Sequence, residues 1–534
     1  MIKELFARKI CFLNKILRKN KQSRTRERVS GKVETGVLIF AAIMYNNQKA
    51  FSERGIQMQG DMIKMPSGAR KALSVFLGAL LGGLMWRFRG THGYGGSWGL
   101  VAVGTAFALL IFVFYGKSIK NGFVLLPVLA VSMGLTVTGW GASNGLLSGY
   151  IHSAAEFPGE GEHVLQFSQP RALIIMLLMG FGLSCLFGLF AGTLISKREY
   201  KLRDYFIFIV VFFAVSYLTK ATVSHLLIKA VSPRLVELFK EGLAAAGKTG
   251  SPWKVYMSHF DKIPWGKKIP FGRAYFEIIE HISHAVAALA LALFAKIGYR
   301  DGKTAGFSLL FNISTAFAIT TADFFNVAGT GRGIIAEIPK LAPFTQNNWG
   351  MWEFCTGFLI GLFLMLILAL MSGKDAAEKA EYEKKSPKMR FAGAFVSGVY
   401  LFALVPARAF VMRITEYLEN KGVIGSESPY DIIGIAALTA AAAVFIFIKL
   451  KKNIFEKNLP APVDCTLTGF AGKALTVYTL AAGLFFIFMP GGVLYGLPWG
   501  AGFFASLFTP DCIVPAVVTV SFALWCGAGI GIRD

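Results

Sequence analysis

The apolar positions of this chain form long uninterrupted runs, and polar residues gather in the connections between the runs. A helix needs about 20 predominantly apolar residues to cross the roughly 30 Å hydrocarbon core of a bilayer. Open sheets are excluded in lipid because their unpaired backbone groups are too costly there. The pattern predicts an all-α, polytopic membrane protein of about twelve transmembrane helices, at residues 73–88, 98–115, 122–140, 172–195, 204–222, 276–296, 304–325, 351–371, 391–410, 431–449, 471–490 and 513–531.

The composition excludes an ordinary soluble protein. Of the 534 residues, 54% are hydrophobic and only 16% are charged, and the mean hydropathy is +0.54. A soluble chain of this length needs more polar residues to cover its surface. The six cysteines are scattered without C-x-x-C spacing, so neither a disulfide framework nor a cysteine metal site is predicted. We expect the lipid bilayer to be the main surroundings of the chain.

The basic residues occupy alternate connections between the predicted spans. The net charge is +24, and Lys and Arg gather in the amino terminus and in the connections 2–3, 4–5, 6–7, 8–9 and 10–11. Cytoplasmic loops of membrane proteins carry such an excess. The distribution therefore predicts a multi-pass plasma-membrane protein with both termini in the cytoplasm. It also accounts for the net charge without a nucleic-acid partner.

The first 64 residues form a separate part of the chain. The stretch "KILRKNKQSRTRERVSGK" is basic and polar, and the "GVLIFAAIMY" that follows is too short to span a bilayer. No small-residue cleavage site follows it, unlike in a signal peptide. Residues 1–64 are therefore either a disordered cytoplasmic tail that contacts anionic lipid or residues upstream of a true start at Met62 or Met65. In both cases residues 65–534 form a single integral membrane domain.

The predicted extracytoplasmic connections are long, and we expect them to be structured. The longest is an insertion at about 220–275, in which "SPRLVELFKEGLAAAGK" predicts one short amphipathic helix at the membrane interface. The "SPWKVYMSHFDKIPWGKKIPFGRAY" that follows is rich in proline and aromatic residues, which is typical of packed irregular structure.

Four ionisable side chains share one helical face in "FEIIEHISHAV", at the predicted outer start of the sixth span. Glu277, Glu280, His281 and His284 have the spacing i, i+3, i+4 and i+7. Such a set suits general acid–base catalysis. His281, His284 and Glu277 also suit a divalent metal, although the order differs from the H-E-x-x-H motif. The alternative is a structural face whose polar groups are satisfied at the interface.

The stretch "RFRGTHGYGGSWG" between the first two spans predicts an anion-binding site. Arg87 and Arg89 offer planar guanidinium groups that match phosphate or carboxylate. The glycines that follow let backbone amides approach an anion at the start of the next helix, and His92 would assist proton transfer. The alternative is a tight glycine turn with arginines reaching to lipid headgroups. The predicted substrate-binding residues here are Arg87, Arg89, Gly93, Gly95 and Gly96.

The connection between spans seven and eight adds further polar residues to this predicted substrate site. They are Arg332, Glu337, Asn347 and Asn348. Asp323, near the outer end of span seven, needs a partner such as Arg332, because a lone carboxylate is costly in a membrane. Together these residues predict a wet, largely cationic cavity that opens outward.

This distribution of chemistry predicts an envelope enzyme, a transferase or hydrolase at the extracytoplasmic face. Its substrate would be anionic or lipid-linked, because arginines bind phosphate and the Glu/His group transfers protons. The alternative is a secondary transporter of an anionic or polar solute, which would use Asn312, Thr315 and Asp323 in span seven. A scaffold or receptor is a third interpretation. The sequence leaves the substrate and the oligomeric state open.

Overall fold

The fold is known from a computed structural model, which describes most of the central part of the chain. The described residues are 67–91, 97–115, 125–137, 169–258, 269, 271–325, 348–372 and 430–455, with scattered positions in 395–425 and 472–520. The chain divides into two units, Met1–Met62 and Ile63–Asp534. Everything below concerns the second unit.

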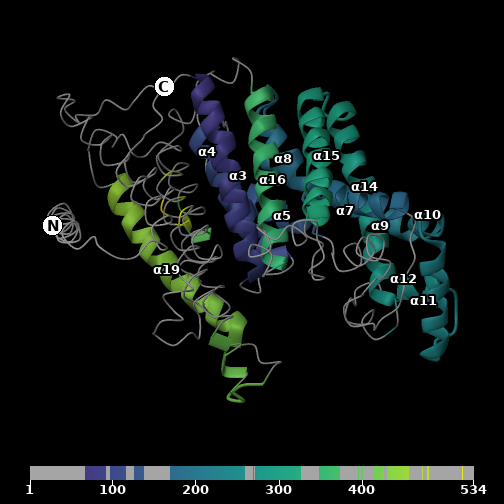
Figure 1. Cartoon of the computed structure of the whole chain (residues 1–534). Coiled ribbons are helices and arrows are strands. Elements are labelled where there is room, and N and C mark those ends of the chain that lie inside the picture. Colours follow the sequence, from purple (N-terminus) through teal and green to yellow (C-terminus); the bar gives the residue numbers. More distant parts are fainter. Residues whose placement is uncertain are drawn as a thin grey trace, which may run out of the picture. The chain divides into compact units, whose positions relative to one another are not determined.

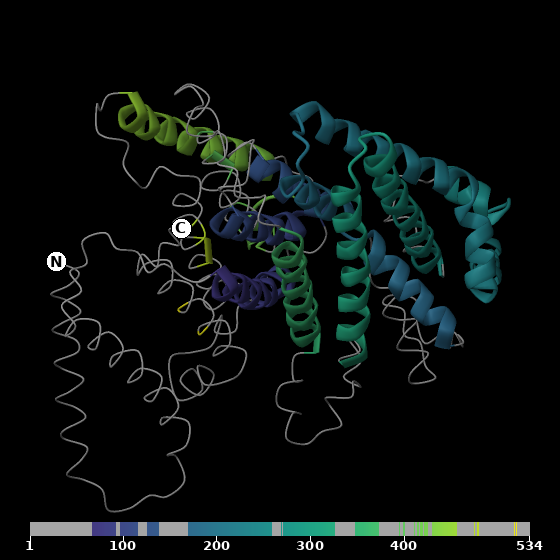
Figure 2. The same ribbon diagram turned by 90° about the horizontal axis from the view of Figure 1, so that it is seen from above.

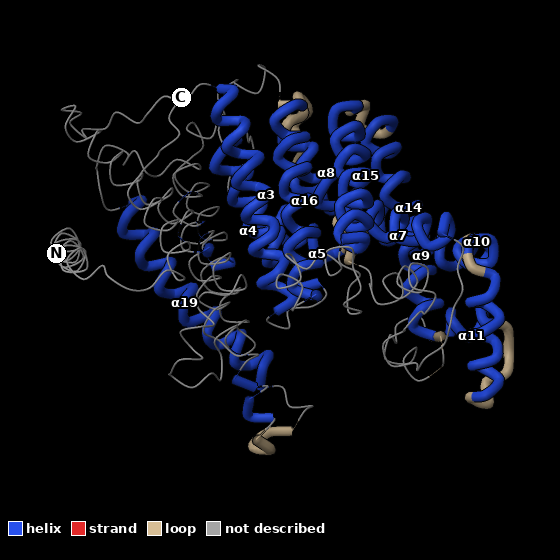
Figure 3. The backbone as a smooth tube through the Cα atoms, in the orientation of Figure 1, coloured by secondary structure: helices blue, strands red, loops and turns tan. Residues whose placement is uncertain are grey.

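Helices are the only regular elements in the described ranges (Figure 1, Figure 3). This confirms the all-α class for the part of the chain that the structure covers. The helices are α3 (Ser67–Thr91), α4 (Ser97–Tyr115), α5 (Leu125–Leu135), α7 (Gln169–Gly182), α8 (Cys185–Leu194), α9 (Leu202–Thr222), α10 (Ser224–Val231), α11 (Pro233–Ala245), α12 (Pro252–Ser258), α14 (Gly272–Ile297), α15 (Gly302–Phe325), α16 (Asn348–Met371) and α19 (Tyr430–Phe455).

Five of the described helices are long and apolar enough to cross a membrane, and a bent pair would make a sixth. The five are α3, α9, α14, α15 and α16, and each coincides with a predicted span. In the span predicted at 122–140, α5 ends at Leu135, earlier than expected, while residues 122–124 and 138–140 lie outside the described residues. The spans at 391–410, 471–490 and 513–531 lie almost wholly outside the described residues, so the number twelve stays a prediction.

The span predicted at 172–195 as one helix is two helices. α7 ends at Gly182 and α8 begins at Cys185, and their axes differ by 47°. Every residue of this stretch is apolar or small, so the hydropathy pattern continues through the break.

The insertion predicted at 220–275 is more helical than expected. α11 confirms the predicted amphipathic helix, since it buries Leu235, Phe239 and Leu243 and exposes Arg234 and Glu237. α10 precedes it, and α12 lies in the stretch for which the sequence suggested irregular structure.

α3 and α4 run antiparallel, as do α8 and α15, and hydrogen bonds identify which of their ends meet. Arg70 at the start of α3 donates to the carbonyl of Phe114 at the end of α4 (2.7 Å). Ser196, after α8, bonds Asp301, before α15. The two basic connections, 195–201 and 298–301, therefore lie together. We call this end of the bundle the basic end, and the end at Arg89 the opposite end.

Glycines bring α3 and α16 into backbone contact. A Cβ on Gly82 would overlap the carbonyl of Gly357, and one on Gly78 would crowd the carbonyl of Gly361. Small residues let membrane helices approach in this way, and the gain is van der Waals packing. α16 lies between α3 and α15 in both views (Figure 1, Figure 2).

Large apolar side chains also cover the outside of the span-length helices. Phe206 and Phe213 on α9, Ile297 on α14 and Phe317 on α15 are all exposed. Apolar surface of this extent is costly in water and is favourable in contact with lipid. The helices are therefore compatible with a membrane-embedded protein.

Candidate functional site at a broken helix

The break between α7 and α8 places irregular backbone inside the helix bundle. Leu183 and Ser184 connect the two helices, and Ser184 has left-handed backbone geometry (φ 56°). The Ser184 hydroxyl donates to the carbonyl of Met133 in α5 (3.0 Å), which fixes the turn. The first amides of a helix have no acceptor within that helix. The break therefore directs the partially positive amino-terminal end of α8 into the bundle.

Asn312 of α15 lies at the level of this break. The Cβ positions of Gly180 and Gly188 approach Ala316 and Phe311, so residues 311–316 cross the stretch 180–188. Ser184 lies about 15 Å from the end of α8 at the basic end of the bundle, and Asn312 lies about 15 Å from the start of α15 at the same end. Asn312 is 0% exposed, and neither its amide nitrogen nor its amide oxygen has a hydrogen-bond partner among the described residues.

Such an asparagine is costly unless something else binds it. A buried amide without hydrogen bonds loses its hydration and gains nothing in return, at a cost of about 1–3 kcal/mol. Ser308, one turn away on the same face, is also buried and its hydroxyl oxygen also has no partner among the described residues. Together these side chains offer donors and acceptors to a ligand in the middle of the bundle.

The predicted Glu/His face of α14 lies beside the same break. His284 packs so closely on Gly182 that a Cβ there would come within 2.7 Å of the histidine Cβ. The His284 ring meets Phe212 of α9 edge to face, with ring centroids 5.0 Å apart. Glu280 pairs with Lys220 of α9 (3.4 Å).

The histidines lie deeper than the sequence suggested. α14 begins at Gly272, so His281 and His284 are about 14 and 18 Å along a helix of about 39 Å. Both are buried among helices, as is Glu277, rather than placed at the mouth of an outer loop. Among the described residues, no group of three or more His, Cys, Asp or Glu side chains is placed to hold a metal ion. The divalent metal stays a prediction.

The predicted anion-binding arginines are held in the protein interior. Arg89 donates to the Glu353 carboxylate of α16 (2.8 Å), and its guanidinium lies 5.4 Å from the Trp86 ring centroid. Both members of this ion pair are almost fully buried, with side-chain exposures of 5% and 9%. Arg87 is also buried. Arg89 therefore joins α3 to α16, a role that sequence spacing did not reveal.

The other predicted site residues lie mostly outside the described residues. Asn348 is the first residue of α16. Asp323 is wholly buried near the end of α15, close in sequence to Ala322, which packs on Trp352. Outside the described residues are His92, Gly93, Gly95, Gly96, Arg332, Glu337 and Asn347.

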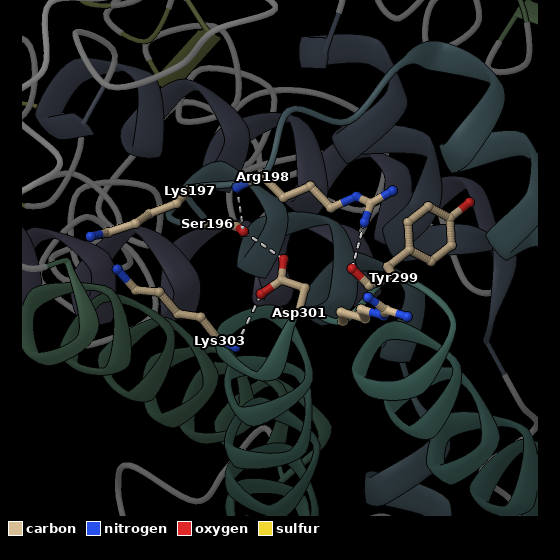
Figure 4. A pocket seen from close by; sticks show the side chains of 7 residues that line it. Ser196, Lys197, Arg198, Tyr299, Asp301 and Lys303 are labelled. Carbon is tan, nitrogen blue, oxygen red and sulfur yellow. Dashed lines mark hydrogen bonds between the residues drawn. The ribbon is translucent and has the colours of Figure 1, made fainter.

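A second polar cluster, which the sequence did not single out, joins the two basic connections (Figure 4). Asp301 Oδ2 accepts hydrogen bonds from the hydroxyls of Ser196, Tyr200 and Thr304. Its Oδ1 accepts the backbone amides of Lys303 and Thr304, both at 3.0 Å. Asp301 thus caps the start of α15 and ties it to the end of α8.

The hydrogen bonds to Asp301 determine its protonation. Burial raises the pKa of this carboxyl, but hydrogen bonds from Ser196, Thr304 and Tyr200 outweigh burial and leave the pKa below its ordinary value. Burial and the neighbouring Asp301 raise the pKa of the Tyr200 phenol. Asp301 is therefore a carboxylate at neutral pH and Tyr200 is a neutral donor.

Replacing Asp301 by asparagine is expected to lower the free energy of unfolding by about 2 kcal/mol at neutral pH, because hydrogen bonds to a charged acceptor are lost. The folded-state pKa lies below the unfolded value of about 4, so the contribution is complete above about pH 4 and is lost as the pH falls further. Thermal unfolding in detergent should show the gap between Asp301→Asn and wild type narrowing below about pH 4. A gap that is constant with pH would contradict a charged Asp301.

Comparisons with known proteins leave the function to be argued from this geometry, because no protein-family model, no curated protein and no solved structure matches the chain.

Proposed function

We propose that this protein is a membrane transporter of a small anionic or polar solute, with the solute site at the break between α7 and α8. The observation that carries the proposal is Asn312, a fully buried amide that has no hydrogen-bond partner among the described residues and lies level with a helix break. Transporters commonly bind their substrates near the bilayer midplane, at interrupted helices whose ends face the site.

The chemistry of the surroundings favours an anion or a hydroxyl-rich solute. The amino-terminal end of α8 offers amide donors and a partial positive charge. Asn312 adds one donor group and one acceptor. Lys220 and His284 lie on the other side of the break, toward α9 and α14. A carboxylate or phosphate on the solute would interact favourably with each of these donors.

The orientation that we propose follows the positive-inside rule. The basic connections 195–201 and 298–301 meet at one end of the bundle, which supports placing the basic end in the cytoplasm of a plasma-membrane protein. Arg89 and Glu353 would then lie near the extracytoplasmic face.

An extracytoplasmic enzyme acting on an anionic or lipid-linked substrate is the second candidate. It is favoured by the buried histidines His281 and His284 close to the Lys220–Glu280 pair, because ionisable residues within a membrane domain are costly and are usually functional. Such an enzyme would depend on His281 and Arg87 and would tolerate changes at Asn312.

Replacing Asn312 by leucine is expected to abolish transport while leaving the protein folded. Leucine has a similar volume and no polar atoms, so it removes both hydrogen-bonding groups and relieves their burial cost of about 1–3 kcal/mol. We expect the melting temperature to stay equal or rise. Uptake in proteoliposomes, measured with labelled organic anions, sugars and inorganic phosphate, should fall at least about tenfold, since one lost polar contact is worth about 1.4 kcal/mol.

The matched control is Ser314→Leu, a polar-to-leucine change on the half-buried side of the same helix. It should transport like wild type. If Asn312→Leu transports normally, the site at the break is wrong. If His281→Ala alone abolishes the cellular function while Asn312→Leu has no effect, the enzyme is favoured instead.

A further inference from the structure

The two basic connections border an open hollow of about 530 Å³ at the basic end of the bundle. Lys197 and Arg198 line it from the connection after α8, Arg300 lines it from the connection before α15, and Lys303 lines it from the first turn of α15. Figure 4 shows the Lys197 and Lys303 side chains extending to the same side of the hollow. Four cationic side chains from two distant parts of the sequence therefore border one space.

Asp301 is the carboxylate among the described residues that line the hollow, and it is already engaged. It accepts five hydrogen bonds through its two oxygens, from the connection after α8 and from the first turn of α15. These bonds hold the turn in place. The other charged residues of the described lining are four cations, and an anion between them is stabilised at short range.

One of the cations is held rigidly. The Arg198 guanidinium donates to the Tyr299 carbonyl and lies 4.6 Å from the centroid of the Tyr299 ring. Arg300 sits on a left-handed turn (φ 53°) between Tyr299 and the fixed Asp301. An ordered wall of this kind lowers the entropy cost of binding.

Exposed apolar side chains begin directly beside the hollow. Leu202 and Phe206 on α9 are 54% and 66% exposed, and Leu293 and Ile297 on α14 are 56% and 73% exposed. α9 and α14 pack together, so these residues form one apolar surface that starts within one turn of the basic connections. A ligand with a charged head and an apolar tail matches both parts.

We infer that this hollow binds the phosphate headgroup of an anionic phospholipid, whose acyl chains lie along α9 and α14. Basic pockets between membrane helices on the cytoplasmic side are suited to such headgroups. A zwitterionic lipid would bring its own positive charge to a hollow that is already lined by four cations. Charge therefore selects phosphatidylglycerol over phosphatidylcholine.

The test is native mass spectrometry of the full-length protein in detergent with equal amounts of phosphatidylglycerol and phosphatidylcholine of the same acyl chains. Wild type should retain phosphatidylglycerol preferentially. Lys197→Gln/Lys303→Gln should reduce this retention roughly tenfold or more, since each basic residue near the surface contributes to headgroup attraction. The matched control is Lys240→Gln/Lys248→Gln, which removes two exposed lysines from the region of α11.

The possible outcomes separate the alternatives. Loss of phosphatidylglycerol in the Lys197/Lys303 variant alone, with unchanged melting temperatures in both variants, supports the lipid site. Equal retention in wild type and that variant, or equal retention of both lipids by wild type, overturns it. Complete displacement of phosphatidylglycerol by excess inorganic phosphate would also overturn it, because the hollow would then recognise a soluble anion without the acyl chains.

Discussion

Glu353→Ala is expected to destabilise the protein by about 3–5 kcal/mol, because it leaves the buried guanidinium of Arg89 without its carboxylate. The Arg89 Nη2 and Glu353 Oε1 atoms are 2.8 Å apart, and both side chains are almost fully buried. Water therefore does not readily solvate the guanidinium when the carboxylate is removed. The expected measurement is a large drop in melting temperature in detergent.

The control for this prediction is to remove both charges together. Arg89→Leu/Glu353→Leu fills the same space without an isolated charge, and buried ion pairs replaced in this way are often close to neutral in stability. The double variant should therefore be much more stable than Glu353→Ala. If the single and double variants melt at the same temperature, the cost comes from lost packing between α3 and α16 rather than from an uncompensated charge.

Gly357→Ala is expected to lower stability by about 2–3 kcal/mol, although the change adds only one methyl group. That methyl would overlap the carbonyl of Gly82 and the Trp86 side chain, so α3 and α16 must move apart. Separating the two helices weakens their contacts along the whole interface, because van der Waals contact is the main attraction between helices in lipid. We expect the variant to show lower expression and a lower melting temperature in detergent than wild type.

Gly306→Ala is the matched control, and we expect it to leave stability unchanged or to raise it slightly. Its added Cβ meets nothing closer than the terminal methyl of Met371 at 3.9 Å. Alanine favours a helix over glycine by up to about 1 kcal/mol, so this variant should be equal to wild type or slightly more stable. A similar loss in both variants would show that the effect belongs to glycine replacement in general and not to the contact between α3 and α16.

The lengths of two membrane helices followed closely from the sequence, because burial in lipid requires an apolar run of defined length. The predicted 204–222 and 304–325 differ from α9 and α15 by two residues at most. The break at Leu183–Ser184 did not follow, since Gly180, Gly182 and Ser184 are ordinary residues in a membrane helix. Nothing in the local pattern distinguishes a helix that continues through such residues from one that ends there.

The candidate site depended on pairings that local spacing does not encode. Arg89 and Glu353 are 264 positions apart, and Arg89 alone resembles a free cation at the end of a span. Asn312 was recognised as a polar residue in a span, but its position level with the helix break needed the packing of α15 on α7 and α8. His281 and His284 were recognised by their spacing, while their depth depended on where α14 begins.

The backbone contact of α3 with α16 also determines which parts of the bundle can move. Helices joined at Gly78, Gly82, Gly357 and Gly361 cannot slide past each other without carbonyls and Cα atoms colliding, so they move as one rigid body. The same argument applies to α7 and α8, because Gly180, Gly182 and Gly188 pack just as closely on α14 and α15. The bundle therefore contains two tightly packed helix contacts, and the solute is proposed to bind beside the second of them.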